Sequence, residues 1–464
     1  MPLESIVRPA SEDLQIDVGF AIGVPPRAAA HQHDGIRSPI QVCTTEFARN
    51  ADDGGVESVP PASLPRRKRH GPASASPGRG ISVAGPNLHG GGGDGPPVEF
   101  PPFELLHWFE DAADGYLHIS HSEILGFRFS EFGRALPDLN LGEAFPRGSP
   151  KLRSLIGAHH QVWPESVLVC NGASEANFLV QAALLRPGDE AIAEVPLYPP
   201  LRDGMAGLGA DVKRAARLPG ERWRLDVDAL EGAITEKTRL VVLTNLNNPT
   251  SGILAEYELR RLADLAEAHG FHVLIDETFR ELAFEQAPPT ASAFSPRFIV
   301  TSTLTKAFGL GGLRLGWVVG PPDVIAKVKG VKDYASICPN RISEELATWA
   351  LERKEGFLAR AKRIVTENRQ LVRAWLERNP AVECHLPDYG NLCFPKLSVS
   401  VDALADRLKQ QFNVVIAPGR FFGMNDHFRL GYGGRATDLK EGLERLDLMV
   451  KTFVRRQKAE GTVP

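Results

Sequence analysis

Apolar and polar positions follow two different patterns along the 464-residue chain. Residues 1–97 show neither a helical nor a strand period, whereas apolar positions recur periodically from Phe100 onward. From Ser166 to Val319, short continuous apolar runs alternate with amphipathic stretches, which is typical of strands buried on both faces of a sheet. The expected strands are Ser166–Cys170, Ala191–Val195, Asp211–Ala216, Arg239–Asn245, His272–Thr278, Phe298–Thr303 and Leu315–Val319.

Amphipathic stretches between these runs predict helices. Apolar residues recur at helical spacing between Glu256 and His269, and Gly270 follows where a glycine commonly ends a helix. The alternation predicts an α/β fold whose large domain contains a mostly parallel sheet covered by helices. After Pro321 the pattern is helical as far as Trp375.

We expect four segments in the chain. They are a disordered, low-complexity extension at 1–97, the N-terminal part of a small domain at 98–150, a ligand-binding large domain at 151–330, and connecting helices with the C-terminal part of the small domain at 331–464. The small α/β domain is thus expected to combine the N- and C-terminal parts. The basic run Arg66–His70 in the extension is either a nucleic-acid or nuclear-import patch or, more commonly, solvated charge.

Composition favours a soluble cytoplasmic protein without a nucleic-acid or membrane partner. Apolar residues make up 43% of the chain, and the net charge of −4 is slight for its length. The five cysteines are widely spread and form no CxxC pair, which indicates reduced thiols. No apolar run is long enough for a transmembrane helix, and the first residues lack a signal peptide's basic start and apolar middle.

One lysine and one aspartate stand where an α/β sheet binds ligands. Lys306 follows the Phe298–Thr303 strand and precedes a glycine-rich loop, so it is either a buried amine nucleophile or a solvated surface lysine. Asp276 ends an apolar run, and a carboxylate at that depth needs a partner. A protonated ring nitrogen of a ligand or a salt bridge within the fold would serve.

Polar residues follow other strand ends. Ser174 stands at a helix start, as part of an anion site or as an ordinary N-cap. Tyr198 either stacks on a flat ligand or anchors its loop, and Asn248 lies in an Asn-Asn-Pro turn from which an amide could reach a ligand. Arg314 follows the glycine-rich loop, and Arg429 is suited to a carboxylate or a structural ion pair.

The order and spacing of these residues resemble the fold-type I pyridoxal-phosphate enzymes, specifically the aminotransferase class I/II family. The motifs that carry the resemblance are Val169–Asn177, Pro196–Pro200, Thr244–Gly252, Leu274–Phe279, Thr301–Gly316 and Phe428–Gly431. The resemblance extends from about Glu99 to Val454. It implies pyridoxal 5'-phosphate as cofactor, with residues 151–330 forming the domain that binds it.

The resemblance also implies a role for each residue. Lys306 would form a Schiff base with the cofactor and then shuttle a proton, while Asp276 would keep the pyridine nitrogen protonated. Tyr198 would stack on the ring, and Asn248 would donate to its O3' oxygen beside the substrate. Arg429 would bind the substrate α-carboxylate. The phosphate would be held by Ala173, Ser174, Thr303 and Arg314.

The implied reaction is transamination between an L-amino acid and a 2-oxo acid by a homodimer. Three departures from the family pattern bear on it. Phe279 stands where the family usually has a tyrosine that donates to O3', Phe145 stands where many members have a tyrosine that reaches the neighbouring subunit's phosphate, and the loop before Asn248 reads Asn-Leu-Asn rather than Asn-Pro-Asn. Two alternatives therefore stay open. The same scaffold could catalyse another carbanion reaction in specialised biosynthesis, as a lyase, decarboxylase or cyclase, or it could bind the cofactor with little turnover.

Overall fold

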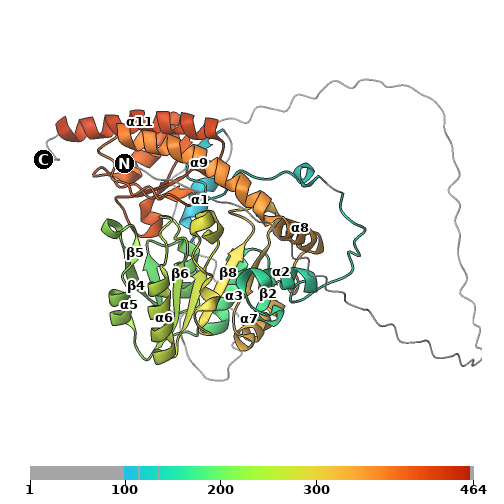
Figure 1. The fold of residues 1–464 in the computed structure, drawn as a ribbon. Helices are drawn as coiled ribbons and strands as arrows, with labels where there is room; N and C mark the ends of the chain where they lie inside the picture. Colours follow the sequence, from blue (N-terminus) through green and yellow to red (C-terminus); the bar gives the residue numbers. More distant parts are fainter. Residues whose placement is uncertain (1–98, 113–114, 134, 460–464) are drawn as a thin grey trace, which may run out of the picture. The chain divides into compact units, whose positions relative to one another are not determined.

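A central sheet organises the structure, a computed structural model that describes residues 99–112, 115–133 and 135–459. In this part of the chain the sheet has eight strands in the order β2-β9-β8-β7-β6-β3-β4-β5 (Figure 1). The neighbours from β8 to β4 pair in parallel, whereas β2, β9 and β5 run antiparallel to their neighbours. The strands are β2 (Val167–Cys170), β3 (Glu190–Val195), β4 (Asp211–Leu218), β5 (Arg224–Leu225), β6 (Thr238–Thr244), β7 (His272–Asp276), β8 (Phe298–Thr303) and β9 (Gly316–Val319). The predicted, mostly parallel sheet is confirmed.

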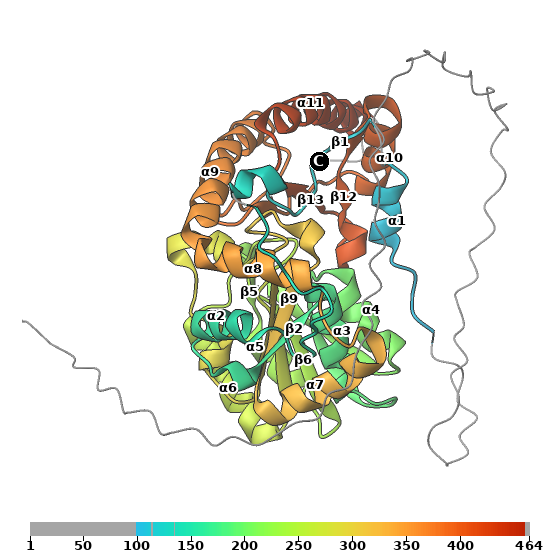
Figure 2. The ribbon, with the colours of Figure 1, turned by 90° about the vertical axis from the view of Figure 1, so that its right-hand side faces the viewer.

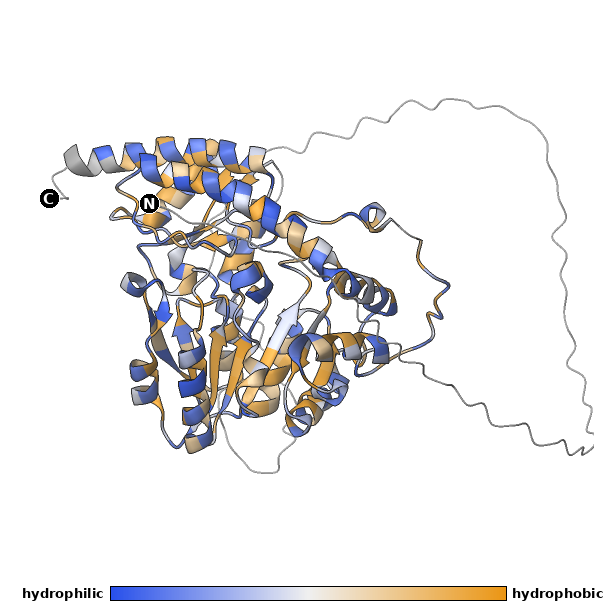
Figure 3. Cartoon of the chain, viewed as in Figure 1, coloured by the Kyte–Doolittle hydropathy of each residue, from blue (hydrophilic) through white to orange (hydrophobic). Residues whose placement is uncertain are grey.

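Both faces of this sheet are buried, because successive side chains of a strand point to opposite sides. Along β7, Val273 and Ile275 belong to one apolar core and Leu274 to the other. Figure 3 shows the strands as an apolar layer between more polar helices. One face is covered by α3 (Ala173–Leu184), α4 (Pro199–Gly207) and α7 (Pro322–Ala335). The other is covered by α2 (Pro150–His160), α5 (Val227–Ala233), α6 (Glu256–His269) and α8 (Arg341–Glu352).

A second, smaller group of elements joins the two ends of the described chain. In it, β1 (Leu117–His118) pairs in parallel with β11 (Val414–Val415). Next to this pair, β13 (Phe428–Gly431) lies antiparallel between β10 (Leu392–Cys393) and β12 (Ala417–Pro418). The helices of this group are α1 (Glu104–Glu110), α9 (Lys354–Arg378), α10 (Val401–Phe412) and α11 (Ala436–Ala459), shown from two sides in Figures 1 and 2. The expected small α/β unit is therefore built from both ends, while the four segment boundaries stay a prediction.

Most predicted elements lie within two residues of the observed bounds. Helix α6 spans the predicted range and ends on Gly270 in the left-handed conformation. Strand β7 ends at Asp276 rather than Thr278, because the Asp276 carboxylate accepts the backbone N–H of Thr278 in a turn.

Some predictions fall outside what the structure describes. The segment 1–97 that was predicted to be disordered, the basic run Arg66–His70 and Cys43 all lie outside the described residues. The four cysteines that are described are unpaired. Among the described helices, none combines the length and the apolar composition that crossing a membrane would require.

Candidate active site

The nine residues singled out in the sequence lie around one cavity of about 380 Å³. The cavity opens at the carboxyl ends of β6, β7 and β8, where the sheet meets the smaller group of elements. Parallel sheets commonly bind their ligands at this edge. The nine residues are Ala173, Ser174, Tyr198, Asn248, Asp276, Thr303, Lys306, Arg314 and Arg429. Their proximity agrees with the predicted site, although the role of each stays a prediction.

One end of the cavity is suited to an anion. Helix α3 begins there, and the first backbone N–H groups of a helix lack partners within it. Arg314 is exposed beside the helix, where it donates only to the Gly311 carbonyl and forms no ion pair with a described residue. The N-cap is Gly172, whose φ is 93°, so the alternative that Ser174 serves as N-cap is wrong. Ser174 lies inside the first turn of α3 and lines the cavity.

Thr303 is tied more closely to the fold than expected. Its hydroxyl donates to the Leu315 carbonyl over 2.7 Å and lies 3.0 Å from the Thr305 hydroxyl. A hydroxyl has one proton to donate, so Thr303 would have to rotate before donating to a phosphate. Thr305 also lines the cavity and was not predicted.

Asp276 lies at the floor of the cavity with only 7% of its surface exposed. Its carboxylate accepts from the Asn177 amide over 2.7 Å and from the Thr278 backbone over 2.9 Å. Burial raises the pKa of Asp276, and these hydrogen bonds only partly oppose the shift. It forms no ion pair with any described residue, so the alternative of a salt bridge within the fold is wrong. A buried carboxylate of this kind suits a cationic ligand atom.

Lys306 is held above this floor by residues from the N-terminal side of the fold. Its Nζ donates to Ser122 Oγ over 3.0 Å and to Glu123 Oε1 over 3.1 Å. The side chain is only 17% exposed, so the alternative of a solvated surface lysine is wrong. Burial lowers the pKa of Lys306, while Glu123 opposes the shift. Phe279 faces the same amine, with its ring centroid 5.9 Å from Nζ.

The backbone at position 309, in the loop after Lys306, requires a glycine. Its φ is 68°, and a Cβ there would stand 2.7 Å from the Leu125 carbonyl oxygen. The segment that carries Glu123 passes at this point, with the Ile124 N–H donating to the Lys306 carbonyl. The glycine therefore lets two distant parts of the chain approach each other.

Arg429 projects from β13 and is fully enclosed. Nε and Nη2 both donate to the Ser120 carbonyl, and Nη1 donates to Asn248 Oδ1 over 2.9 Å. A guanidinium has five N–H groups, so one proton on each terminal nitrogen remains available. Burial lowers its pKa to about 10, which leaves it charged at neutral pH. The alternative of a structural ion pair is wrong within the described chain, because Arg429 has no carboxylate partner there.

The bond from Arg429 also orients Asn248. Because the amide oxygen of Asn248 accepts from Arg429, its NH₂ group is left as a donor toward the cavity. The neighbouring Asn247 has a structural role, since its amide donates to Glu194 and to the Pro196 carbonyl. Glu194 in turn forms a buried ion pair with Arg217 over 2.5 Å.

Tyr198 contributes an aromatic wall. Its ring meets that of Phe103 edge-on, at a centroid distance of 5.7 Å. Burial raises the pKa of Tyr198 to about 12, so its hydroxyl stays protonated at neutral pH. Both earlier interpretations, stacking on a flat ligand and anchoring the loop, are compatible with this position.

Seven polar lining residues were not predicted as site residues, among them Thr244, which ends β6, and Thr278, which follows β7. His121, Ser122 and Glu123 come from the segment after β1, and Asn177 and Thr305 support Asp276 and Thr303. Burial, aided by the nearby His118, lowers the pKa of His121 to about 4. The sequence carries no local signal for the three residues after β1, because Glu123 and Lys306 lie 183 positions apart.

Comparisons with known proteins agree with this architecture. The family model for aminotransferase class I and II matches residues 144–446. Capreomycidine synthase from Streptomyces vinaceus is 28% identical over 378 residues, covering 78% of this chain and 97% of that protein. A probable aspartate/prephenate aminotransferase from Thermus aquaticus is 29% identical over 325 residues, covering 67% of this chain and 84% of that protein. The solved structure of a PLP-dependent aminotransferase from Streptococcus suis 89-1591 is 27% identical, with a TM-score of 0.72 over 76% of this chain and 98% of that one.

Proposed function

Because the chain belongs to the aminotransferase class I and II family, we propose that it transfers an amino group between an L-amino acid and a 2-oxo acid. Its fold is that of the fold-type I enzymes, and its cofactor is pyridoxal 5'-phosphate. The proposed enzyme is a homodimer in the cytoplasm. Amino acids and 2-oxo acids are the substrates of this family as a whole.

The cavity fits the cofactor at both ends. A Cβ on Gly172 would stand 2.6 Å from Arg314 Nη2, so the glycine keeps room for a guanidinium beside the start of α3. This arrangement suits a phosphate, since the arginine lacks an anion among the described residues. At the other end, the buried Asp276 carboxylate lacks a cation, which a protonated pyridine nitrogen would supply.

The position of Lys306 is the observation that carries the proposal. When bound, pyridoxal phosphate supplies an aldehyde that bonds to amines and a ring that accepts electrons from the substrate α-carbon. Burial lowers the pKa of Lys306, which raises the fraction of neutral amine able to bond covalently and to move a proton. Asn248 would orient the ring, and Arg429 would bind the α-carboxylate through its two remaining N–H groups.

A second candidate is another carbanion reaction on the same scaffold, such as a cyclisation. Two observations favour it. One relative, which this chain matches over 97% of the relative's length, is named capreomycidine synthase and not an aminotransferase. Phe279 lines the cavity without the hydroxyl that the family pattern usually places there.

Conversion of the bound cofactor tests the proposal. The purified holoprotein is mixed with a panel of L-amino acids, and pyridoxamine phosphate is measured by chromatography after denaturation. We expect at least one amino acid to convert the cofactor. Lys306→Ala should abolish borohydride-stable attachment and slow conversion by about 10²–10⁴-fold, because the proton-transferring amine is lost.

Lys362→Ala is the matched control, since Lys362 forms a surface ion pair with Glu285 outside the cavity. It should keep both attachment and conversion. A holoprotein that reacts with amino acids without ever yielding pyridoxamine phosphate would remove transamination and favour the second candidate. Attachment that persists in Lys306→Ala would assign the cofactor to another lysine.

A further inference from the structure

Five charged side chains line the described cavity. The positive ones are Lys306, Arg314 and Arg429, and the negative ones are Asp276 and Glu123. The proposed function uses four of them, for the phosphate, the ring nitrogen, the covalent bond and the α-carboxylate. Glu123 is left without an assigned partner once Lys306 is bonded to the cofactor.

Glu123 is available to a ligand. Its side chain is 48% exposed, and only Oε1 accepts a hydrogen bond from the Lys306 amine. The proposed bond to the cofactor would leave the Lys306 nitrogen with at most one N–H group, so Glu123 would lose the ammonium that now faces it. The carboxylate would then stand at the cavity wall beside the reacting centre, near the Arg429 charge but without a hydrogen-bond donor or ion-pair partner among the described lining residues.

Backbone hydrogen bonds hold the segment that carries this carboxylate on both sides of Glu123. On one side of Glu123, the Ile119 N–H donates to the Val415 carbonyl over 3.2 Å. On the other side, Ile124 donates to the Lys306 carbonyl over 3.3 Å and Leu125 to the Gly433 carbonyl over 2.7 Å. A charged group on a segment held at both ends can select a ligand without a large ordering cost.

The surroundings of Glu123 suit a chain that is apolar along its length and positive at its end. Phe103, Leu105, Leu106 and Phe109 line the cavity and offer a surface for methylene groups. His121, two residues from Glu123, has its pKa lowered to about 4 mainly by burial, so it adds no positive charge at neutral pH. Arg429 is already engaged with Ser120 and Asn248.

We propose that Glu123 recognises the side chain of the amino substrate, and that this side chain ends in an amine or a guanidinium. This inference rests on the proposed attachment of the cofactor to Lys306. It does not require that the reaction be a transamination, because a cyclising enzyme would recognise its substrate at the same wall.

Matched pairs of amino acids test the charge directly. L-arginine is compared with L-citrulline, whose urea group is neutral and similar in shape, and L-lysine with L-norleucine. Dissociation constants are measured on the holoprotein from the change in its visible absorbance. In at least one pair we expect the cationic member to bind about 10- to 100-fold more tightly, the range of a charge-assisted hydrogen bond.

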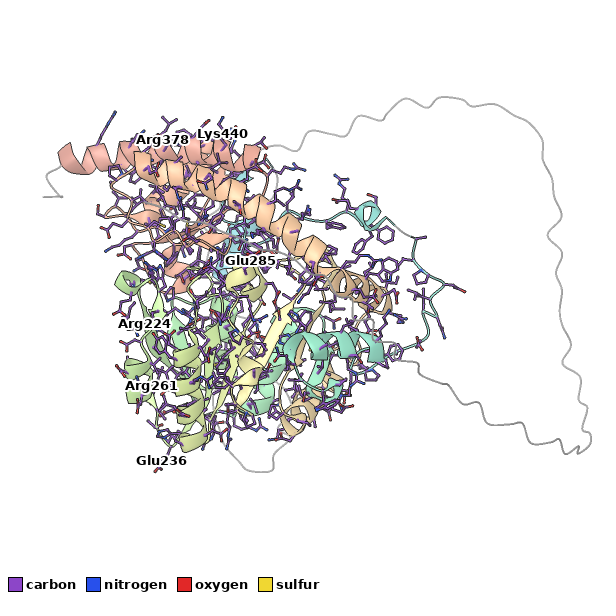
Figure 4. The ribbon with its side chains drawn as sticks, viewed as in Figure 1. Arg224, Glu236, Arg261, Glu285, Arg378 and Lys440 are labelled. Atoms are coloured by element: carbon purple, nitrogen blue, oxygen red, sulfur yellow. The ribbon has the colours of Figure 1, made fainter. Side chains whose placement is uncertain are left out.

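Glu123→Gln should reduce that preference to near unity while the neutral member keeps its affinity. Glu285→Gln is the matched control: Glu285, labelled in Figure 4, pairs with Lys362 over 2.7 Å and does not line the cavity. It should leave the preference unchanged. The glutamine at position 123 keeps the shape of the side chain, so loss of folding is not expected, and retained cofactor absorbance verifies this.

Three results would overturn the inference. They are a wild-type protein without preference in either pair, a preference that survives Glu123→Gln, and an equal loss of affinity for both members, which would mean that Glu123 only supports Lys306. Failure of the proposed function has a different signature. In that case the pairs still differ in binding, but no pyridoxamine phosphate accumulates.

Discussion

Phe279 presents an apolar ring to the Lys306 amine at the cavity wall. Only 6% of its surface is exposed, and its ring centroid lies 5.9 Å from Lys306 Nζ. A phenyl ring cannot donate to the cofactor's O3' oxygen, whereas the Asn248 amide nitrogen can. In the proposed attachment, Phe279 would therefore bear on the proton affinity of the nitrogen that joins Lys306 to the cofactor.

We expect Phe279→Tyr to lower the pKa of that nitrogen. The added hydroxyl would donate to O3', which stabilises the form in which O3' is negative and the nitrogen has lost its proton. A lowered pKa means that the proton leaves at lower pH. A pH titration of the visible absorbance should therefore show its midpoint shifted downward.

Phe279→Leu serves as the control, because it removes the ring without adding a donor. Its midpoint should not move downward. An unchanged or raised midpoint in Phe279→Tyr would show that the hydroxyl at this position does not reach O3'.

At the scale of elements, the start of α3 defines the proposed phosphate site. Gly172 is the N-cap, and its φ of 93° lies in the region that favours glycine. The turn brings the first N–H groups of α3 beside Arg314. The dipole of α3, its first backbone N–H donors and the Arg314 charge would thus all attract an anion at the proposed phosphate site.

Gly172→Ala should weaken cofactor binding more than it weakens the fold. The new Cβ would stand 2.6 Å from Arg314 Nη2 and push the guanidinium aside. Loss of one charge-assisted contact predicts about a 10- to 100-fold rise in the dissociation constant for pyridoxal phosphate, measured by equilibrium dialysis.

Gly188→Ala separates the two effects. Gly188 has a φ of 87°, and a Cβ there meets nothing within 4 Å. Both variants should lower the free energy of unfolding by about 1–3 kcal/mol through backbone strain, but only Gly172→Ala should release the cofactor. Equal release from both would assign the loss to strain instead of to Arg314.

The same elements show what a sequence can predict. Seven of the eight described strands of the sheet and helix α6 were predictable, because burial on both faces or on one stripe leaves a periodic record, whereas the two-residue β5 was missed. The alternative of an N-cap at Ser174 was wrong, because serine is a common cap but the turn required the positive φ of Gly172. The statistical preference for serine at helix N-caps does not show which position in the turn needs a positive φ.

The whole molecule explains the residues that were missed. Local patterns placed Asp276 and Lys306, since Asp276 ends a buried strand and Lys306 follows one. Glu123 follows no such strand, and its contact with Lys306 depends on the pairing of β1 with β11. Two-residue pairings of this kind are too short to leave a pattern in the sequence.

Arg429 joins three parts of the molecule at the cavity. It belongs to β13, donates to Ser120 of the N-terminal segment, and donates to Asn248 at the end of the central sheet. Its two remaining N–H groups are those proposed to bind the substrate. A change at Arg429 should thus affect stability and substrate binding together while leaving the cofactor in place.

Arg429→Lys tests this coupling. An ammonium keeps the charge but cannot span Ser120, Asn248 and a carboxylate at once. We expect the free energy of unfolding to fall by about 1–3 kcal/mol, because a buried acceptor loses its donor. The KM for the amino substrate should rise about 10- to 100-fold with the visible absorbance retained. Arg224→Lys, at an exposed arginine labelled in Figure 4 that pairs with Glu221, should change neither quantity. A raised KM without any loss of stability would mean that Arg429 binds substrate but does not connect the three parts.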